Sequence, residues 1–142
     1  MAEAKIRVLF DLNILLDVLQ ERKEYYHSSA LLLAYAETDA IQGWLSAHSV
    51  TTLFYLIARD QSPEQARVTL TNFLQFLRIA SVDQNTIEQA LNLPYKDFED
   101  AIKAIAALQV HAHYLVTRNV RDYQPAPLEV VQPAELLSIL EV

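Results

Sequence analysis

An alternation of short apolar segments with longer amphipathic ones is the feature of this sequence that most restricts its fold. Apolar runs of the length of a buried strand occupy residues 6–10, 41–45, 78–82, 113–117 and 128–131. Between them, apolar residues recur at helical spacing in 13–22, 24–37, 49–59, 63–77, 85–91, 97–110 and 133–140. This order predicts an α/β domain whose parallel sheet is covered on both faces and binds ligands beyond the carboxyl ends of its strands.

The residues that are rare or missing exclude several chemistries. Gly43 is the single glycine and there is no cysteine. A phosphate-binding GxxxxGK[ST] loop, a GxGxxG dinucleotide turn and a GxSxG nucleophile elbow all need more glycine. The lack of cysteine excludes disulfide frameworks, thiolate zinc sites, iron–sulfur ligation and a cysteine nucleophile. With 142 residues, 52% of them hydrophobic, the chain is predicted to form a single domain over 1–142.

The net charge of the chain restricts how it can bind nucleic acid. The chain has 11 basic and 18 acidic residues, a net charge of −7 and a pI near 4.9. A protein that holds nucleic acid by phosphate neutralisation alone is usually basic, so a nucleic-acid partner here needs a local basic patch or a bound metal ion. The sequence has neither a signal-peptide pattern nor an apolar stretch of about 18 residues, and we expect a soluble cytoplasmic protein with no membrane association.

The first polar group at a predicted strand end is Asp11, with Asn13 in the turn that follows it. Both side chains are expected at the carboxyl edge of the sheet. Taken alone, the segment favours Asp11 or Asn13 as the N-cap of the next helix, a common use of these residues after a strand.

The second group lies at the start of the helical segment 97–110. On a helical wheel Asp97 falls within the apolar arc and Asp100 on its margin, whereas Glu99 and Lys103 are predicted to point away. Asp97 could be the N-cap of the helix. Asp100 lies too deep for a cap, and a carboxylate beside apolar residues needs a cation, a donor or water, so Asp100 is the stronger candidate for a functional site.

The third group follows the predicted strand 113–117. Thr117, Asn119 and Asp122 can turn back over the same edge, with Arg118 and Arg121 beside them. Alone, the segment is also explained by an Asx turn and a surface ion pair. Three strand ends that carry oxygen ligands, without histidine or cysteine partners at ligand spacing, favour Mg²⁺ or Mn²⁺ over zinc.

At these positions the sequence resembles the PIN-domain nucleases, which include the VapC-type ribonuclease toxins of bacterial toxin–antitoxin pairs. The resemblance covers nearly the whole chain and depends on FDLNILLDVL, DFEDAIKAIAAL and YLVTRNVRDY, in that order. It implies a three-layer α/β/α sandwich with a parallel sheet of four or five strands. It also implies metal-dependent cleavage of RNA phosphodiesters, homodimers and masking by a small antitoxin protein.

The resemblance assigns roles to four residues. Asp11 is similar to the first metal-ligating acid of the family and Asn13 to its polar neighbour. Asp100 is similar to the central acid, with Asp97 as an accessory.

The sequence departs from the family pattern at two places. In the SxxTxxE pattern Ser49 and Thr52 match, but Tyr55 replaces the glutamate. Two residues after Thr117, where the family usually has an acid, this sequence has Asn119. Asp122 is the candidate to replace that acid.

We therefore predict a divalent-metal-dependent ribonuclease, the toxin component of a toxin–antitoxin pair. The expected catalytic residues are Asp11 and Asp100, assisted by Asp97, Asn119 or Asp122. The expected metal ligands are Asp11, Asp100 and Asp122. The residues expected to contact the substrate are Asn13, Thr117, Arg118 and Arg121. The alternative is a catalytically weakened PIN-fold binding module that acts through protein partners. The Asp11–Leu12–Asn13 turn also resembles the DxD motif of haloacid-dehalogenase-type phosphatases, but Asn13 is not an acid and no lysine motif follows.

Overall fold

A computed structural model describes residues 5–141 of the chain. Its strands are β1 (Arg7–Phe10), β2 (Gln42–Ser46), β3 (Leu77–Ala80), β4 (Tyr114–Val116) and β5 (Glu129–Val131). Its helices are α1 (Leu12–Leu19), α2 (Tyr26–Glu37), α3 (Ala47–Asp60), α4 (Pro63–Phe73), α5 (Gln84–Ala90), α6 (Phe98–Gln109), α7 (Pro133–Leu140) and the 3₁₀ helix η1 (Val120–Tyr123). These elements correspond one to one with the predicted strands and helices, with η1 in addition.

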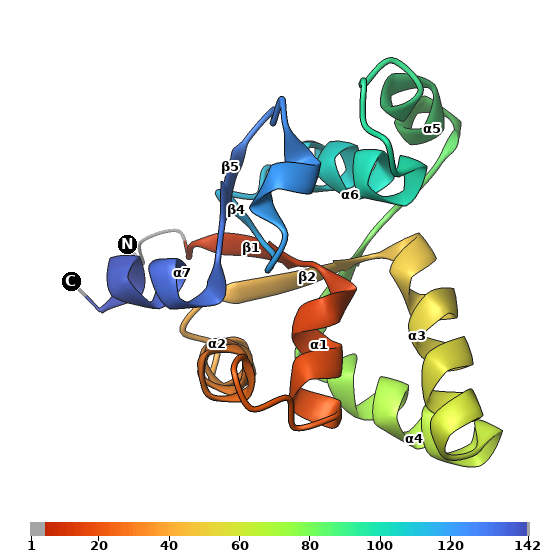
Figure 1. The fold of residues 1–142 in the computed structure, drawn as a ribbon, viewed down its shortest axis with the longest axis vertical. Coiled ribbons are helices and arrows are strands. Elements are labelled where there is room, and N and C mark those ends of the chain that lie inside the picture. The colour runs from red at the N-terminus through yellow and green to blue at the C-terminus, as the bar shows by residue number, and fades with distance from the viewer. Residues whose placement is uncertain (1–4, 142) are drawn as a thin grey trace.

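The strands form one parallel sheet in the order β3-β2-β1-β4-β5. Helices α1, α2 and α4 lie on one side of the sheet, and α5 and α6 lie on the other (Figure 1). The predicted three-layer α/β/α sandwich with a parallel sheet is thus confirmed. None of the described helices has the length and apolar character needed to cross a membrane.

Alternation along the central strands builds the two cores of the sandwich. In β1, Val8 and Phe10 pack with α1, α2 and α4, whereas Leu9 packs on the opposite face against α6. This period of two is the geometry of a strand with both faces buried. Helix α6 presents Ala104 and Ala107 to the sheet, and these small side chains let the helix lie close to the strand ends.

One predicted boundary was wrong. The apolar period suggested a helix to Leu77, but α4 ends at Phe73 and Leu77 begins β3, where it pairs with Gly43. Helical periodicity does not separate a final helical turn from the first residue of a following strand, since both place an apolar side chain in the core.

Gly43 lies in β2, where side chains of α2 and of both neighbouring strands pack closely against it. A Cβ atom at this position would lie 2.6 Å from Leu77 Cδ2 and 3.1 Å from both Ala36 Cβ and Phe10 Cε2. We expect Gly43→Ala to lower the free energy of unfolding by about 1–3 kcal/mol, the usual cost of an extra methyl group in a packed core. Urea unfolding measures the change, and an unaltered midpoint would contradict the packing described here.

Candidate active site

The register of the two central strands brings Asp11 and Thr117 together. Phe10 pairs with Val116, and the Asp11 backbone N–H donates to the Val116 carbonyl at 3.0 Å. One residue beyond each strand, the Thr117 hydroxyl donates to Asp11 Oδ2 at 2.7 Å, and both side chains are buried. The Thr117 oxygen in turn accepts from the Asn119 backbone N–H at 3.1 Å. The Asp11 carboxylate is therefore held at the carboxyl edge by the sheet itself.

The first turn of α6 supplies the second part of the site. Asp97 is the N-cap, and its Oδ1 accepts from the Glu99 backbone N–H at 2.9 Å. Asp100 lies one turn into the helix with 9% of its surface exposed, and its Oδ1 accepts from the buried Tyr123 hydroxyl at 3.1 Å. The positive end of the helix dipole favours carboxylates at this terminus. Asp97 thus does act as a cap, and it does so through Oδ1.

Lys103 connects these two parts. Its ammonium group donates to Asp11 Oδ1 at 2.9 Å and to Asp100 Oδ1 at 3.4 Å, and the residue is only 4% exposed. The prediction that Lys103 points away from the apolar arc was wrong. Its position three residues after Asp100 puts both residues on neighbouring parts of the helix surface, and its long stem carries the charge to the sheet edge. This spacing was the available sequence signal.

A hollow of about 200 Å³ opens beside these three charged groups. It brings together side chains from the ends of β1 and β4 and from the start of α6, namely Asp11, Leu12, Asn13, Asp97, Glu99, Asp100, Lys103, Asn119, Asp122 and Tyr123. Six of the residues predicted for the site line it, and Thr117 lies behind Asp11. The residues that line the hollow include five acids and one base, so the site carries an excess of negative charge.

The buried charges shift one another's pKa values. Burial raises the pKa of Asp100 above its ordinary value, and the neighbouring Asp97 and Asp11 carboxylates act in the same direction. Burial works against the charged form of Lys103, but Asp11 and Asp100 outweigh it and the pKa of Lys103 is raised. Burial and the same two carboxylates raise the pKa of Tyr123, so its hydroxyl remains a neutral donor to Asp100. The folded protein thus disfavours the charged form of Asp100, even with Lys103 beside it.

The two arginines of the predicted substrate set lie in different surroundings. Arg118 does not line the hollow: its Nε lies 3.1 Å from Oδ2 of the buried Asp17 in α1, and its guanidinium stacks on the Tyr25 ring at 4.4 Å. Arg22 reaches the other oxygen of Asp17 at 3.3 Å. Arg121 is exposed and lines a neighbouring hollow of about 430 Å³, which shares Asp97 and Asp122 with the acidic one. Arg118 thus pairs with a buried acid of α1, whereas Arg121 lies in the hollow that also contains Asp97 and Asp122.

This difference predicts opposite consequences for the two arginines. Arg118→Gln leaves the buried Asp17 with Arg22 as its remaining cation, and we expect the free energy of unfolding to fall by about 1–3 kcal/mol. Arg121→Gln removes the same charge from an exposed position and should leave stability unchanged. Chemical denaturation of both variants measures the contrast, and equal stability of the two would contradict the structural role of Arg118.

No sequence pattern indicates the contact that His48 makes. His48 lies at the start of α3, half-buried, and its Nε2 donates to the Glu99 carbonyl oxygen at 3.1 Å. Burial lowers the pKa of His48, although the Glu99 carbonyl opposes the shift. The contact joins the first turns of α3 and α6. Tyr55, further along α3, is 64% exposed and does not line the hollow.

The donors of the site suit a hard divalent ion. Within residues 5–141, no three acidic or histidine side chains converge closely enough to form a metal site by themselves. Asp11 and Asp100, however, direct one oxygen each at the same position, that of the Lys103 ammonium. Mg²⁺ is commonly held by one or two carboxylates, with water and substrate phosphate completing the shell. The residues present therefore fit an ion of this kind.

A parallel sheet with an acidic hollow at its carboxyl edge defines an α/β protein with a candidate ligand site at the strand ends. The family model for the PIN domain matches residues 7–121, and the chain belongs to the PIN-domain family. The resemblance seen in the sequence is confirmed. No curated protein matches the chain.

Several solved structures share the fold. A toxin–antitoxin complex from Klebsiella pneumoniae contains a chain that is 26% identical, with 89% of this chain and 97% of that one covered and a TM-score of 0.68. The VapBC2 complex of Rickettsia felis, bound to a promoter DNA fragment, matches at 20% identity over 89% and 98% of the two chains, with a TM-score of 0.65. Mycobacterium tuberculosis VapC20, a toxin that cleaves the sarcin–ricin loop, matches at 14% identity over 76% and 86%, with a TM-score of 0.60.

Proposed function

We propose that the protein is a divalent-metal-dependent ribonuclease, and that it is the toxin of a toxin–antitoxin pair. The observation that carries this proposal is the convergence of Asp11 and Asp100 on one position at the carboxyl edge of the sheet. Membership of the PIN-domain family supports a nuclease, and the similarity to a Klebsiella toxin–antitoxin complex supports the biological role.

In this proposal Asp11 and Asp100 hold Mg²⁺ or Mn²⁺, assisted by Asp97, Asn119 or Asp122. The ion supplies charge neutralisation at the phosphate and lowers the pKa of bound water. The hydroxyls of Thr117 and Tyr123 each donate to a ligand carboxylate and fix its orientation, as outer-shell partners do in metal sites. No nucleophile from the protein is required.

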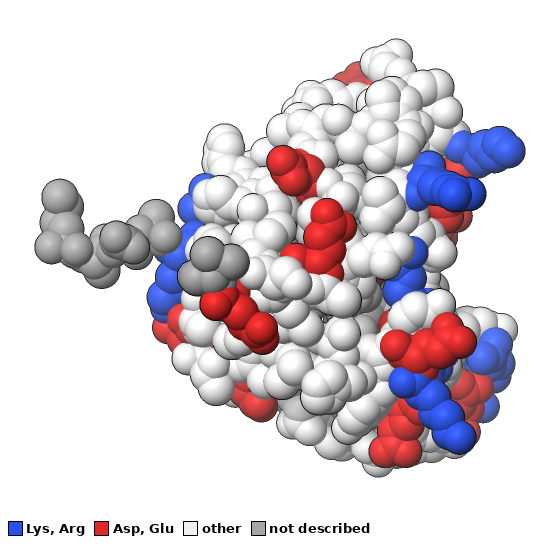
Figure 2. Space-filling view, turned by 60° about the vertical axis from the view of Figure 1, so that its left-hand side comes forward, with Lys and Arg blue, Asp and Glu red and all other residues white. Residues whose placement is uncertain are grey.

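RNA is the proposed substrate because its phosphates complement a metal-loaded acidic site. On the face shown in Figure 2, basic and acidic side chains of the described residues are interspersed and form no continuous basic surface. Without the ion the acidic hollow repels RNA, so metal and substrate should bind together. Asn13 lines the hollow and Arg121 borders it, and we assign them contacts to the flanking nucleotides. Arg118 receives no such role, since Asp17 occupies its guanidinium.

The proposed partners are a small antitoxin protein and a second copy of the chain. The matched toxin–antitoxin complexes support the antitoxin. The exposed apolar side chains of α3 and α4, such as Tyr55 and Val68, support self-association. Light scattering at high micromolar concentration should give a mass above the 16.2 kDa of one chain, and a clean monomer would contradict the dimer.

A second candidate function is a PIN-fold binding module that acts through protein partners. It is favoured by Tyr55, which replaces the family glutamate and lies outside the hollow, and by Lys103, which already neutralises part of the acidic cluster. Such a module would keep its partner interactions without metal.

Cleavage of RNA by purified protein distinguishes the two functions. The ribonuclease should cleave total cellular RNA in Mg²⁺ or Mn²⁺ and lose this activity in EDTA, and Asp100→Asn purified in parallel controls for contaminating nuclease. Cleavage that persists in EDTA, or that is equal in the Asp100→Asn variant, would contradict the proposal.

A further inference from the structure

Lys103 occupies the position where the two ligand carboxylates meet. Its ammonium group donates one hydrogen bond to Asp11 Oδ1 and one to Asp100 Oδ1. Lys103 as a whole is only 4% exposed. It is the one basic side chain among the described residues that line the hollow. Among the described residues, the ion pairs of Lys103 are those with Asp11 and Asp100, and no other base lines the hollow beside these two carboxylates.

A divalent ion cannot share this position with the ammonium group. Carboxylate oxygens coordinate Mg²⁺ at about 2.0–2.1 Å, so an ion bound to both Oδ1 atoms overlaps the space that Nζ fills. Two cations in contact in a poorly solvated hollow also repel strongly, because the local dielectric is well below that of water. Binding of the ion between Asp11 and Asp100 therefore requires the ammonium to leave both oxygens.

We propose that Lys103 is a built-in competitor of the divalent ion, which holds Asp11 and Asp100 together in the metal-free protein and is displaced when the ion binds. This inference rests on the proposed metal-dependent function. It adds that Lys103 sets the concentration of divalent ion needed to occupy the site. The apparent dissociation constant of a ligand rises in proportion as the binding-competent state becomes rarer. Lys103 thus weakens apparent metal affinity by the factor by which its paired state outweighs its displaced state.

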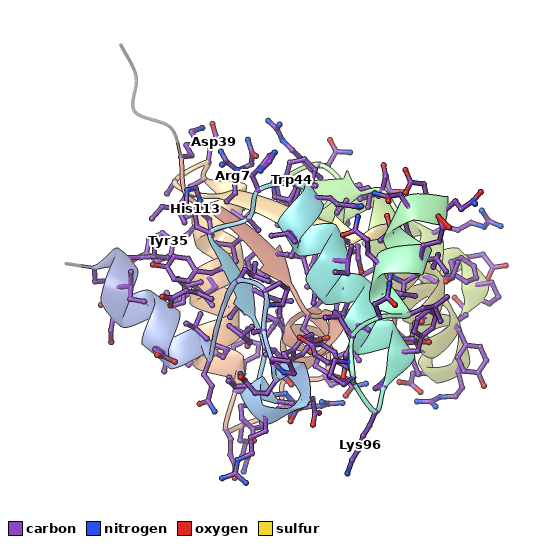
Figure 3. All side chains as sticks on the ribbon, turned by 90° about the horizontal axis from the view of Figure 1, so that it is seen from above. Arg7, Tyr35, Asp39, Trp44, Lys96 and His113 are labelled. Atoms are coloured by element: carbon purple, nitrogen blue, oxygen red, sulfur yellow. The ribbon has the colours of Figure 1, made fainter. Side chains whose placement is uncertain are left out.

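Mn²⁺ affinity of four proteins tests the inference. Free Mn²⁺ is measured by electron paramagnetic resonance in titrations of the wild type, Lys103→Gln, Lys103→Arg and Lys96→Gln. Lys96 is the matched control: it carries the same charge but is exposed, precedes α6, points away from the protein (Figure 3) and lines the neighbouring hollow rather than the acidic one. We expect Lys103→Gln to bind Mn²⁺ at least about tenfold more tightly than the wild type, and Lys96→Gln to differ by less than about threefold because solvent and salt screen its charge.

The arginine variant separates competition by charge from a change of shape. Lys103→Arg keeps a cation that can pair with both carboxylates, so its Mn²⁺ affinity should not exceed that of the wild type. Affinity as high as that of Lys103→Gln would overturn the inference.

A second measurement follows the ammonium group itself in the wild type, and a variant is needed only to assign its signal. The buried Lys103 ammonium should give a ¹⁵N–¹H signal protected from solvent exchange in EDTA, identified by its absence in Lys103→Arg. Saturation with diamagnetic Mg²⁺ should remove or shift this signal. An unchanged signal at saturating Mg²⁺ would show that the ion and the ammonium coexist and would overturn the inference.

The outcomes separate this inference from the function on which it rests. Equal Mn²⁺ affinity of the wild type and Lys103→Gln overturns the role of Lys103 and leaves a metal-dependent site intact. Absence of Mn²⁺ binding in both proteins overturns the metal-dependent function, and the competition with it.

Discussion

Replacing Asp11 by alanine is expected to lower the free energy of unfolding of the metal-free protein by about 3–5 kcal/mol, the usual result of removing one partner from a buried ion pair. The variant leaves the Lys103 ammonium with only the longer contact to Asp100, at 3.4 Å. It also leaves the Thr117 hydroxyl without its acceptor. Urea unfolding in EDTA measures the change.

Asp11→Asn is the matched control for this variant. Its amide oxygen can still accept a hydrogen bond at the same place, so it should lose less stability than the alanine variant, although it removes the charge opposite Lys103. Both changes should abolish metal-dependent cleavage of RNA. An Asp11→Ala protein within about 1 kcal/mol of the wild type would refute the buried ion pair, since loss of one partner costs several times more.

The Asp100→Asn variant is expected to lose RNA cleavage by at least about 100-fold while its metal-free stability stays level or rises. Asparagine keeps an oxygen that accepts from Tyr123, and it removes a carboxylate whose charge burial and two neighbouring acids oppose more strongly than Lys103 favours it. Cleavage requires the second metal ligand, whereas folding does not. Cleavage assays and thermal unfolding of the same preparations measure the two effects.

The pH dependence follows from the raised pKa of Asp100. Because the folded protein binds this proton more tightly than the unfolded chain, the contribution of Asp100 to stability increases as the pH falls through its raised pKa. The advantage of Asp100→Asn over the wild type should therefore be largest at neutral pH. It should be lost below the ordinary value of 3.8, where Asp100 is protonated in both states. A constant difference between the two proteins from neutral to acid pH would contradict the pKa shift.

Metal adds a third distinction. At ten times its dissociation constant, Mn²⁺ should stabilise the wild type by roughly 1.4 kcal/mol and Asp100→Asn by clearly less. If Asp100 were only a structural acceptor, its variant would instead be less stable by about 1–3 kcal/mol with or without metal. That second pattern would remove Asp100 from the proposed catalytic set.

The fold was predictable because its signals are local. Each strand is a short apolar run and each helix has its own period and caps, such as Ser62, whose side chain accepts from the Gln65 backbone as the capping pattern indicates. The end of α4 was not predictable, since Leu77 satisfies the helical period and also pairs with Gly43 in the sheet. Only the neighbouring strand distinguishes the two roles.

The site was predictable in part, for a related reason. Asp11 and Asn119 were placed near each other because parallel strands end at one edge, and the structure brings both to the acidic hollow. The partner of Arg118 is Asp17, a residue on another element, and no local pattern indicates such a contact. Lys103 was misplaced because a helical wheel gives the direction of the Cβ atom, whereas the ammonium lies at the end of a long stem.

A crystal soaked in Mn²⁺ tests the central claim most directly, because the anomalous signal of manganese locates the ion without reference to activity. We expect a peak within coordination distance of the carboxylates of both Asp11 and Asp100, with the Lys103 ammonium moved away from them. An acidic hollow without such a peak at saturating Mn²⁺, or a peak that touches neither carboxylate, would contradict it.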